Sequence, residues 1–196
     1  MKVRQVGMAQ YTYGPTAIAT PANVITAIRV ALTPVIAFNY YDHGPSLFVF
    51  ILWTLVSVTD KADGWLARRQ GATKSGAFLD PLADKILVFG GFAAIVFRGD
   101  AWWLPIAAMA LREIWMSLYR TKLSKVGISV PARPLGKAKT FVQMIAIGII
   151  FMPGVGEVRL PIGQLFIYAS LALAYISLYY YLVDGHNKVA ALPKGE

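Results

Sequence analysis

The chain has 196 residues, of which 57% are hydrophobic and only 15% are charged. In soluble domains about a quarter of all residues are charged, so this composition favours a membrane protein. The net charge of +9 does not indicate nucleic-acid binding, because the chain lacks the polar surface on which basic patches bind nucleic acid. The absence of cysteine excludes disulfides, thiolate catalysis and zinc–thiolate sites. Two histidines, His43 and His186, are too few for a histidine-based metal site.

Six apolar segments, counted with their flanks, are long enough to cross a hydrocarbon core, which takes about 20 helical residues. They predict an all-α integral membrane protein with a bundle of six transmembrane helices over residues 20–185. Residues 1–19 are expected as a juxtamembrane segment on the inner leaflet or as a frayed polar tail, and residues 186–196 as a cytoplasmic tail. The apolar segments cover residues 21–41, 46–58, 82–97, 102–119, 141–152 and 162–183.

Positive charge is distributed unevenly between the connections of these segments. The first connection, residues 42–45, has no Lys or Arg, the third has only Arg98 and the fifth only Arg159, whereas most other cations fall on the opposite side. By the positive-inside rule, both termini and the second and fourth connections are cytoplasmic. Since the outer connections are too short to hold a domain, any chemistry is expected at the cytoplasmic face. No transit peptide is recognised, which favours a bacterial inner membrane over a mitochondrial membrane.

Residues 60–84 contain four of the ten acidic residues, arranged as two pairs. Asp60 and Asp63 are spaced i, i+3 and Asp80 and Asp84 are spaced i, i+4, so each pair is expected on one face of a helix. A helix from residue 46 rises roughly 21 Å before Asp60, which places the first pair near the cytoplasmic boundary. The second pair is expected to open the third helix on the same side. A single aspartate here is also explained as a helix cap, and Asp80 before Pro81 suits a helix N-terminus.

Four carboxylates at one depth need cations or protons to offset their mutual repulsion. Oxygen ligands without His or Cys select a hard cation, Mg²⁺ or Mn²⁺. Two such ions balance four aspartates, which fits two-metal displacement at phosphorus. Small residues between the pairs leave room for a ligand near the backbone, or serve close helix packing. They are Gly64, Ala67 and Gly76. Arg68 is the cation best placed for a diphosphate, and with Arg69 and Lys74 it is also explained as an inner-leaflet charge.

This pattern resembles the signature of the CDP-alcohol phosphotransferases, Asp-x2-Asp-Gly-x2-Ala-Arg and, after a spacer, Gly-x3-Asp-x3-Asp. The connector over residues 69–75 is one residue shorter than is usual in that family, at a place where a loop absorbs a deletion easily. Every fixed position is present, as Asp60, Asp63, Gly64, Ala67, Arg68, Gly76, Asp80 and Asp84. The wider chain is similar to the phosphatidylglycerophosphate synthase branch of the family, in residues 20–34, 76–85, 111–114 and 134–144.

The resemblance implies the CDP-alcohol phosphotransferase fold and a reaction that joins a CDP-linked donor to an alcohol and releases CMP. It implies that Asp84 is the general base on the acceptor hydroxyl and also a metal ligand. Asp60, Asp63 and Asp80 are implied as the other ligands of two Mg²⁺ or Mn²⁺ ions. The resemblance also leads us to expect a homodimer. The implied donor-binding residues are Asn23, which alone reads as a helix cap, with Asp63, Gly64, Ala67, Arg68 and Gly76.

A second polar set points to an anionic acceptor. Arg112 lies inside the fourth apolar segment, where a charge needs a partner. It is explained by a pair with Glu113 or another acid, by snorkelling, or by capture of a phosphate-bearing alcohol. Arg29, in the first segment, is expected to reach the donor or to brace the bundle. The acceptor-binding candidates are Arg112, Arg120, Lys137 and Lys139, with Arg133 nearby; Lys137 and Lys139 are equally explained as headgroup anchors.

The main hypothesis is transfer of the phosphatidyl group from CDP-diacylglycerol to glycerol 3-phosphate. With the same fold, the acceptor would instead be phosphatidylglycerol, as in a cardiolipin synthase, or inositol phosphate. An intramembrane prenyltransferase fits less well, because its acidic motifs lie far apart in sequence. A cation transporter would carry acids at mid-bilayer depth on several spans, whereas these acids are expected at the interface.

Overall fold

The computed structural model describes residues 20–70, 74–125 and 134–190, with side chains undescribed at 22, 60–70, 74–78, 80, 125 and 187–190. The expected juxtamembrane segment, residues 1–19, and the end of the expected tail lie outside the described residues. Every regular element in the described ranges is helical. The helices are α1 (Pro21–His43), α2 (Leu47–Gln70), α3 (Lys74–Arg98), α4 (Trp103–Lys125), α5 (Pro134–Phe151), η1 (Gly156–Val158, a 3-10 turn) and α6 (Arg159–Ala190).

The six predicted helices match six long helices, and the described residues contain three helices apolar and long enough to cross a membrane. These spans are Asn23–His43, Pro134–Phe151 and Gly156–His186, while the apolar part of α2, Leu47–Thr59, is shorter. Many large apolar side chains are exposed, among them Phe38 and Phe97. Such a surface is typical of lipid contact rather than of a monomer in water. The chain is therefore an all-helical membrane protein.

Two helix starts differ from the sequence prediction. The helix α3 begins at Lys74, so Pro81 lies inside it and the expectation that the second aspartate pair opens this helix is wrong. A proline removes one backbone donor but does not end a helix whose neighbours satisfy the freed group. The helix α5 begins at Pro134, ahead of the apolar stretch predicted from residue 141. Its first turns carry lysines that face a polar cavity, which apolar periodicity does not detect.

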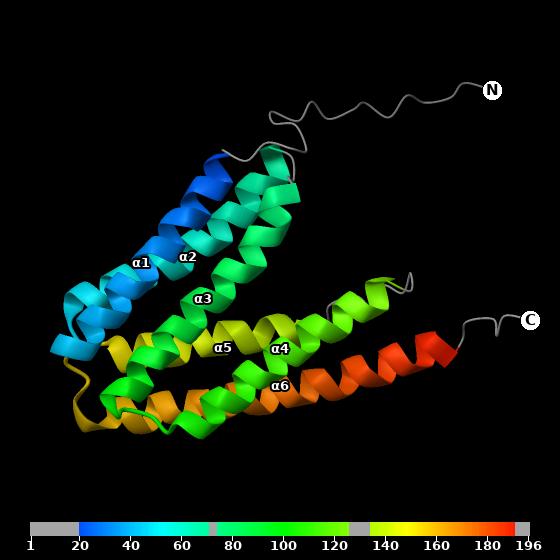
Figure 1. Cartoon of the computed structure of the whole chain (residues 1–196). Helices are drawn as coiled ribbons and strands as arrows, with labels where there is room; N and C mark the ends of the chain where they lie inside the picture. The colour runs from blue at the N-terminus through cyan, green and yellow to red at the C-terminus, as the bar shows by residue number, and fades with distance from the viewer. Residues whose placement is uncertain (1–19, 71–73, 126–133, 191–196) are drawn as a thin grey trace, which may run out of the picture.

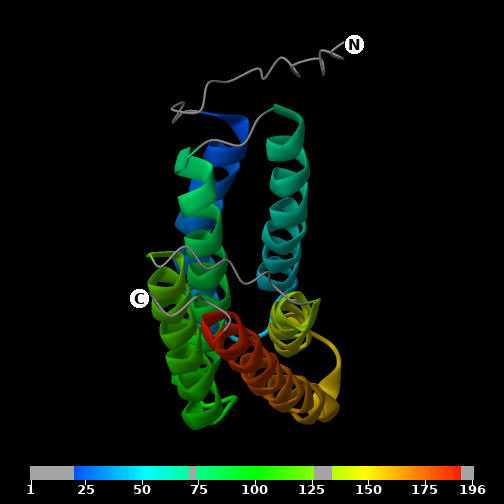
Figure 2. The ribbon, with the colours of Figure 1, turned by 90° about the vertical axis from the view of Figure 1, so that its right-hand side faces the viewer.

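The helices form two groups that meet at one end and diverge at the other (Figures 1 and 2). One group is α1, α2 and α3, and the other is α4, α5 and α6. The α1–α2, α3–α4 and α5–α6 connections lie at the end where the groups meet, and the described helices diverge toward the end of α2 and the start of α3. The most extensive helix contacts are those of α5 with α6 and of α1 with α3.

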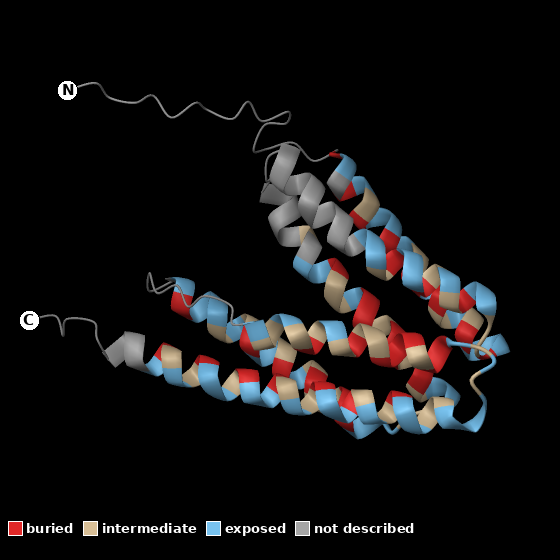
Figure 3. Ribbon diagram, turned by 180° about the vertical axis from the view of Figure 1, so that it is seen from behind, coloured by how far each residue is buried: buried red, intermediate tan, exposed pale blue. Residues whose placement is uncertain are grey.

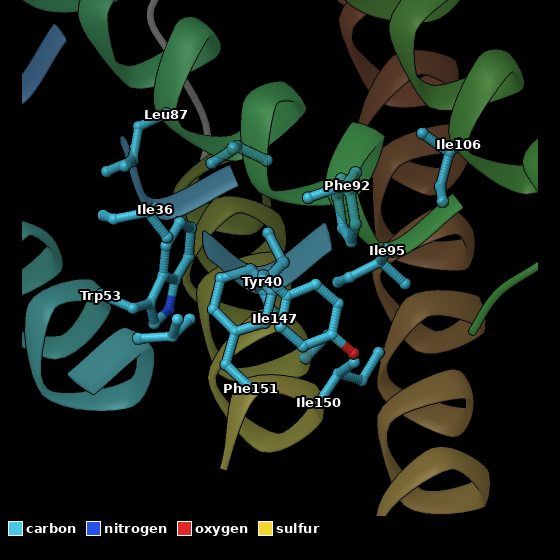
Figure 4. Close-up of a cluster of buried hydrophobic side chains, with 14 of the residues drawn as sticks. Ile36, Tyr40, Trp53, Leu87, Phe92, Ile95, Ile106, Ile147, Ile150 and Phe151 are labelled. Carbon is cyan, nitrogen blue, oxygen red and sulfur yellow. The ribbon is translucent and has the colours of Figure 1, made fainter. Parts of the chain in front are cut away.

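The main hydrophobic core lies where the two groups meet, and buried residues are most concentrated there (Figure 3). The ring of Phe151 contacts the ring of Tyr40, with centroids 4.4 Å apart, and the edge of Trp53 at 5.5 Å (Figure 4). Ile95 and Ile147 pack in the same cluster and are fully buried. A Cβ at Gly163 would clash with Ile150, so the glycine allows α5 and α6 to approach closely. This core fixes how the other ends of the helices diverge.

A polar network closes the same end of the molecule. Asp100 Oδ2 accepts a hydrogen bond from the Tyr40 hydroxyl, and Arg98 Nε lies 3.6 Å from Asp100 Oδ2. Arg98 Nη1 also donates to the carbonyl of Tyr41 at 2.7 Å. Arg159 Nη1 donates to the Tyr40 hydroxyl at 3.2 Å and to the carbonyl of Ile150. The two arginines predicted on the outer side thus tie together the ends of α1, α3, α5 and α6.

Candidate functional site

A polar cavity of about 430 Å³ lies between α3, α4 and α5. Helical spacing brings the lining residues of each helix to one face: residues 81, 84, 85, 88 and 89 on α3, and 112, 113, 116, 117 and 120 on α4. The cavity has an excess of positive charge, with five cationic and two acidic side chains. These are Asp84, Lys85, Arg112, Glu113, Arg120, Lys137 and Lys139.

Asp84 borders this cavity and also contacts α1. Its side chain is 37% exposed, whereas the partner Arg29 is 1% exposed. Arg29 Nη1 donates to Asp84 Oδ1 at 3.3 Å. Arg29 therefore links α1 to the aspartate of α3 that is predicted to be catalytic. Such a link between helices agrees with the bracing role, one of the two interpretations of Arg29 in the sequence. A buried guanidinium holds the carboxylate at the wall of the cavity.

The other three signature aspartates lie in described helices, but their side chains are outside the described set. Asp60 and Asp63 belong to α2, and Asp80 belongs to α3 with Asp84, so both predicted spacings lie in helical backbone. The end of α2 and the start of α3 lie at the same end of the molecule (Figure 1). This backbone arrangement and the oxygen-only donor set fit hard divalent cations. Among the described side chains no three acidic or histidine groups gather, so convergence of the four aspartates stays a prediction.

The remaining predicted donor-site residues are distributed over three helix ends. Gly64, Ala67 and Arg68 lie in the last part of α2 and Gly76 in the first turn of α3, all with side chains outside the described set. Asn23 is buried at the start of α1. Its backbone N–H donates to Thr20 Oγ1 at 3.2 Å, so the capping residue of α1 is Thr20 and the alternative interpretation of Asn23 as the cap is wrong.

The predicted acceptor cations do come together, around a residue that the sequence offered only as a structural partner. Arg112 is 5% exposed and Lys139 is 6% exposed. Glu113 Oε1 accepts a hydrogen bond from Arg112 Nη1 at 2.6 Å and another from Lys139 Nζ. The pair of Arg112 with Glu113, one of the interpretations considered, is confirmed. Arg112 Nε is buried and has no hydrogen-bond partner.

Two further cavity residues were missed by sequence reasoning. Lys85 Nζ donates to Ser117 Oγ at 2.6 Å, and Ser117 Oγ donates to the carbonyl of Glu113 at 2.9 Å. A usable signal was present, because Lys85 follows Asp84 directly and Ser117 is one helical turn after Glu113.

The other acceptor candidates lie nearer the edge of the cavity. The guanidinium of Arg120 lies over the ring of Tyr181, 5.2 Å from its centroid. Lys137 is exposed and lines the cavity from the first turn of α5. Arg133 lies outside the described residues.

An all-helical membrane protein with an aspartate beside a cationic cavity is matched by one family model. The model described as CDP-alcohol phosphatidyltransferase matches residues 19–176. The chain belongs to this family of enzymes, which confirms the resemblance drawn from the aspartate signature.

Individual relatives agree with this assignment. A protein of Mycobacterium tuberculosis (strain H37Rv) named probable phosphatidylglycerophosphate synthase is 36% identical over 147 residues, which are 71% of this chain and 69% of the relative. The CDP-diacylglycerol–glycerol-3-phosphate 3-phosphatidyltransferase of Rickettsia bellii is 33% identical over 165 residues, 81% of this chain and 91% of the relative. The protein of the same name from Sodalis glossinidius is 35% identical over 166 residues, covering 81% and 90%.

Proposed function

We propose that this enzyme is a phosphatidylglycerophosphate synthase. It transfers the phosphatidyl group of CDP-diacylglycerol to glycerol 3-phosphate and releases CMP. The observation that carries the proposal is the cavity between α3, α4 and α5, where five cationic side chains lie beside Asp84. An excess of positive charge in the cavity, with Arg112 and Lys139 buried, favours an acceptor that carries a phosphate over a neutral or zwitterionic alcohol. The names of the relatives from Rickettsia bellii and Sodalis glossinidius support the same donor and acceptor.

The proposed setting is a bacterial inner membrane with the site on the cytoplasmic side. In this proposal α2, α3 and α4 also span the bilayer, giving six transmembrane helices, and both termini are cytoplasmic, as the charge asymmetry predicts. The lipid donor then enters sideways from the inner leaflet, while the soluble acceptor enters from the cytoplasm. Residues 1–19 and 186–196 flank the catalytic bundle. The protein acts as a homodimer.

Asp60, Asp63, Asp80 and Asp84 would hold two divalent ions, Mg²⁺ or Mn²⁺. When bound, these ions neutralise the diphosphate of the donor and the charge that develops on departing CMP. The residues proposed to shape the nucleotide pocket are Asn23, Asp63, Gly64, Ala67, Arg68 and Gly76. Glycine and alanine leave space for the nucleotide against the backbone, and an arginine pairs well with a phosphate oxygen.

Asp84 accepts the proton of the attacking hydroxyl of glycerol 3-phosphate in this proposal. The acceptor oxygen forms a bond to the phosphorus of the phosphatidyl group, and the bond from that phosphorus to the CMP oxygen breaks. Arg29 keeps the carboxylate in place through its 3.3 Å contact. The cavity cations bind the phosphate of the acceptor, so its hydroxyl is presented to Asp84. The cationic members are Lys85, Arg112, Arg120, Lys137 and Lys139.

The same cavity would also accept other phosphate-bearing alcohols, so acceptor competition is the decisive test. We expect purified protein with CDP-diacylglycerol and Mg²⁺ to release CMP only when glycerol 3-phosphate is added. Excess chelator should stop the release, and Mg²⁺ or Mn²⁺ should restore it. Release that depends on phosphatidylglycerol or inositol phosphate instead would overturn the proposed acceptor. Absence of release with every acceptor would overturn the proposed reaction.

A further inference from the structure

Glu113 links two helices across the polar cavity. In the part of the chain that the structure describes, α4 and α5 each pack on α6 and are not among the helix pairs in extensive contact with each other. One carboxylate oxygen of Glu113, Oε1, accepts from Arg112 of α4 and from Lys139 of α5. The carboxylate therefore sets the distance between the two cations on opposite walls of the cavity.

The burial of these cations makes the carboxylate necessary before any ligand arrives. Arg112 and Lys139 are both buried, and a buried charge without a counter-charge is strongly unfavourable. Each would also repel the other in the absence of Glu113. The next turn of α4 continues the arrangement, because Ser117 bonds to the Glu113 carbonyl and accepts from Lys85 of α3. One face of α4 thus orders a cation from each of the three helices around the cavity.

The two cations retain donors after pairing with Glu113. An ammonium has three N–H donors and a guanidinium has five, so a single carboxylate oxygen occupies a minority of them. One of the remaining donors, Arg112 Nε, is buried and has no hydrogen-bond partner. An anion that enters the cavity therefore meets cations that are already ordered and still able to donate.

We propose that Glu113 is a positioning residue for phosphate recognition. It holds Arg112 and Lys139 as a preformed receptor for the doubly charged phosphate of the acceptor and acts through them without touching the substrate. Ordering these long side chains in advance lowers the entropic cost of binding. The inference rests on the proposed function, because it names how the acceptor site of that reaction recognises its ligand.

The first test replaces the carboxylate by the isosteric amide, Glu113→Gln, in the full chain. We expect the dissociation constants of glycerol 3-phosphate and of inorganic phosphate, measured by calorimetry in detergent, to rise about tenfold or more. The KM for glycerol 3-phosphate should rise by a similar factor, while kcat and the KM for CDP-diacylglycerol stay within about twofold. The matched control is Glu157→Gln, an exposed carboxylate in η1 outside the cavity lining, which should change none of these values.

A double-mutant cycle tests whether Glu113 acts through Lys139. Because both residues serve one interaction, Glu113→Gln should weaken phosphate binding much less in a Lys139→Gln background than in the wild type. If Glu113→Gln does not fold, Glu113→Asp replaces it. Aspartate keeps the negative charge on a shorter side chain, farther from the two cations, so this variant should weaken phosphate binding less than the roughly tenfold expected for Glu113→Gln. Unchanged or tighter phosphate binding in the folded variants, or additive effects in the cycle, would overturn the inference.

The calorimetric binding measurements allow this inference to fail independently of the proposed function. Wild-type protein that binds phosphate through Glu113-dependent cations but releases no CMP with glycerol 3-phosphate would contradict the proposed function alone. Wild-type protein that turns over glycerol 3-phosphate while Glu113→Gln binds it normally would contradict the inference alone. Wild-type protein that binds neither glycerol 3-phosphate nor inorganic phosphate would overturn the inference as well.

Discussion

Replacement of Asp84 by asparagine is expected to lower kcat for CMP release by about a thousandfold. An amide cannot accept the proton of the acceptor hydroxyl, and a positioned general base contributes on the order of a hundredfold to ten-thousandfold. The amide of asparagine is also a weaker ligand for a hard cation than the carboxylate of aspartate. The measurement is steady-state CMP release at saturating CDP-diacylglycerol and glycerol 3-phosphate.

The Asp84→Asn variant needs a control for folding, because the aspartate also pairs with Arg29. Thermal unfolding in detergent should therefore be recorded beside the activity. Asp42→Asn removes an exposed carboxylate from the last turn of α1 and should leave kcat unchanged. A well-folded Asp84→Asn enzyme that keeps more than about a tenth of wild-type kcat would contradict the assignment of this residue as general base.

Replacement of Arg112 by glutamine is expected to raise the KM for glycerol 3-phosphate by about a hundredfold. Charge-assisted hydrogen bonds to a buried guanidinium contribute up to about 3 kcal/mol each, and glutamine supplies neither the charge nor the fork of donors. The loss should fall mainly on acceptor binding, so kcat at saturating acceptor should change only a few-fold. The measurement is the KM of each substrate in turn.

The matched control for Arg112→Gln is Lys122→Gln, which removes an exposed cation from the same helix outside the cavity lining. This control should leave both KM values unchanged. Equal increases in the KM for glycerol 3-phosphate and for CDP-diacylglycerol would show that Arg112 supports the whole bundle. An unchanged KM for glycerol 3-phosphate would remove Arg112 from the acceptor site.

The sequence predicted the family and the number of helices, but not every helix start or the contacts between helices. The spacing of the aspartate pairs and the run of apolar segments were enough to predict six helices and the family, because both patterns are local. The start of α3 at Lys74 was missed since Pro81 resembles a helix start, and interior prolines depend on neighbouring helices to satisfy the backbone. Three helices in the described part of the chain are long and apolar enough to cross a membrane, and the crossing of the other three stays a prediction.

Long-range partners could not be predicted from spacing. Arg29 and Asp84 are far apart in sequence and meet only because α1 packs on α3. Arg112 was predicted as an acceptor cation from its charge inside the fourth apolar segment and Lys139 from its place at the head of the fifth, and the structure places both in one cavity. The bridge made by Glu113 depends on how α4 and α5 are rotated about their axes, which no local pattern records. The assignment of the substrate-binding residues is a prediction that rests on the sequence and the structure together.

The most direct measurement is an experimental structure of the full-length protein with bound glycerol 3-phosphate. We expect its phosphate in the cavity between α3, α4 and α5, within hydrogen-bond distance of Arg112 and Lys139, with its attacking hydroxyl toward Asp84. Glycerol 3-phosphate bound outside this cavity, or inside it with the phosphate away from both cations, would contradict the proposed acceptor site.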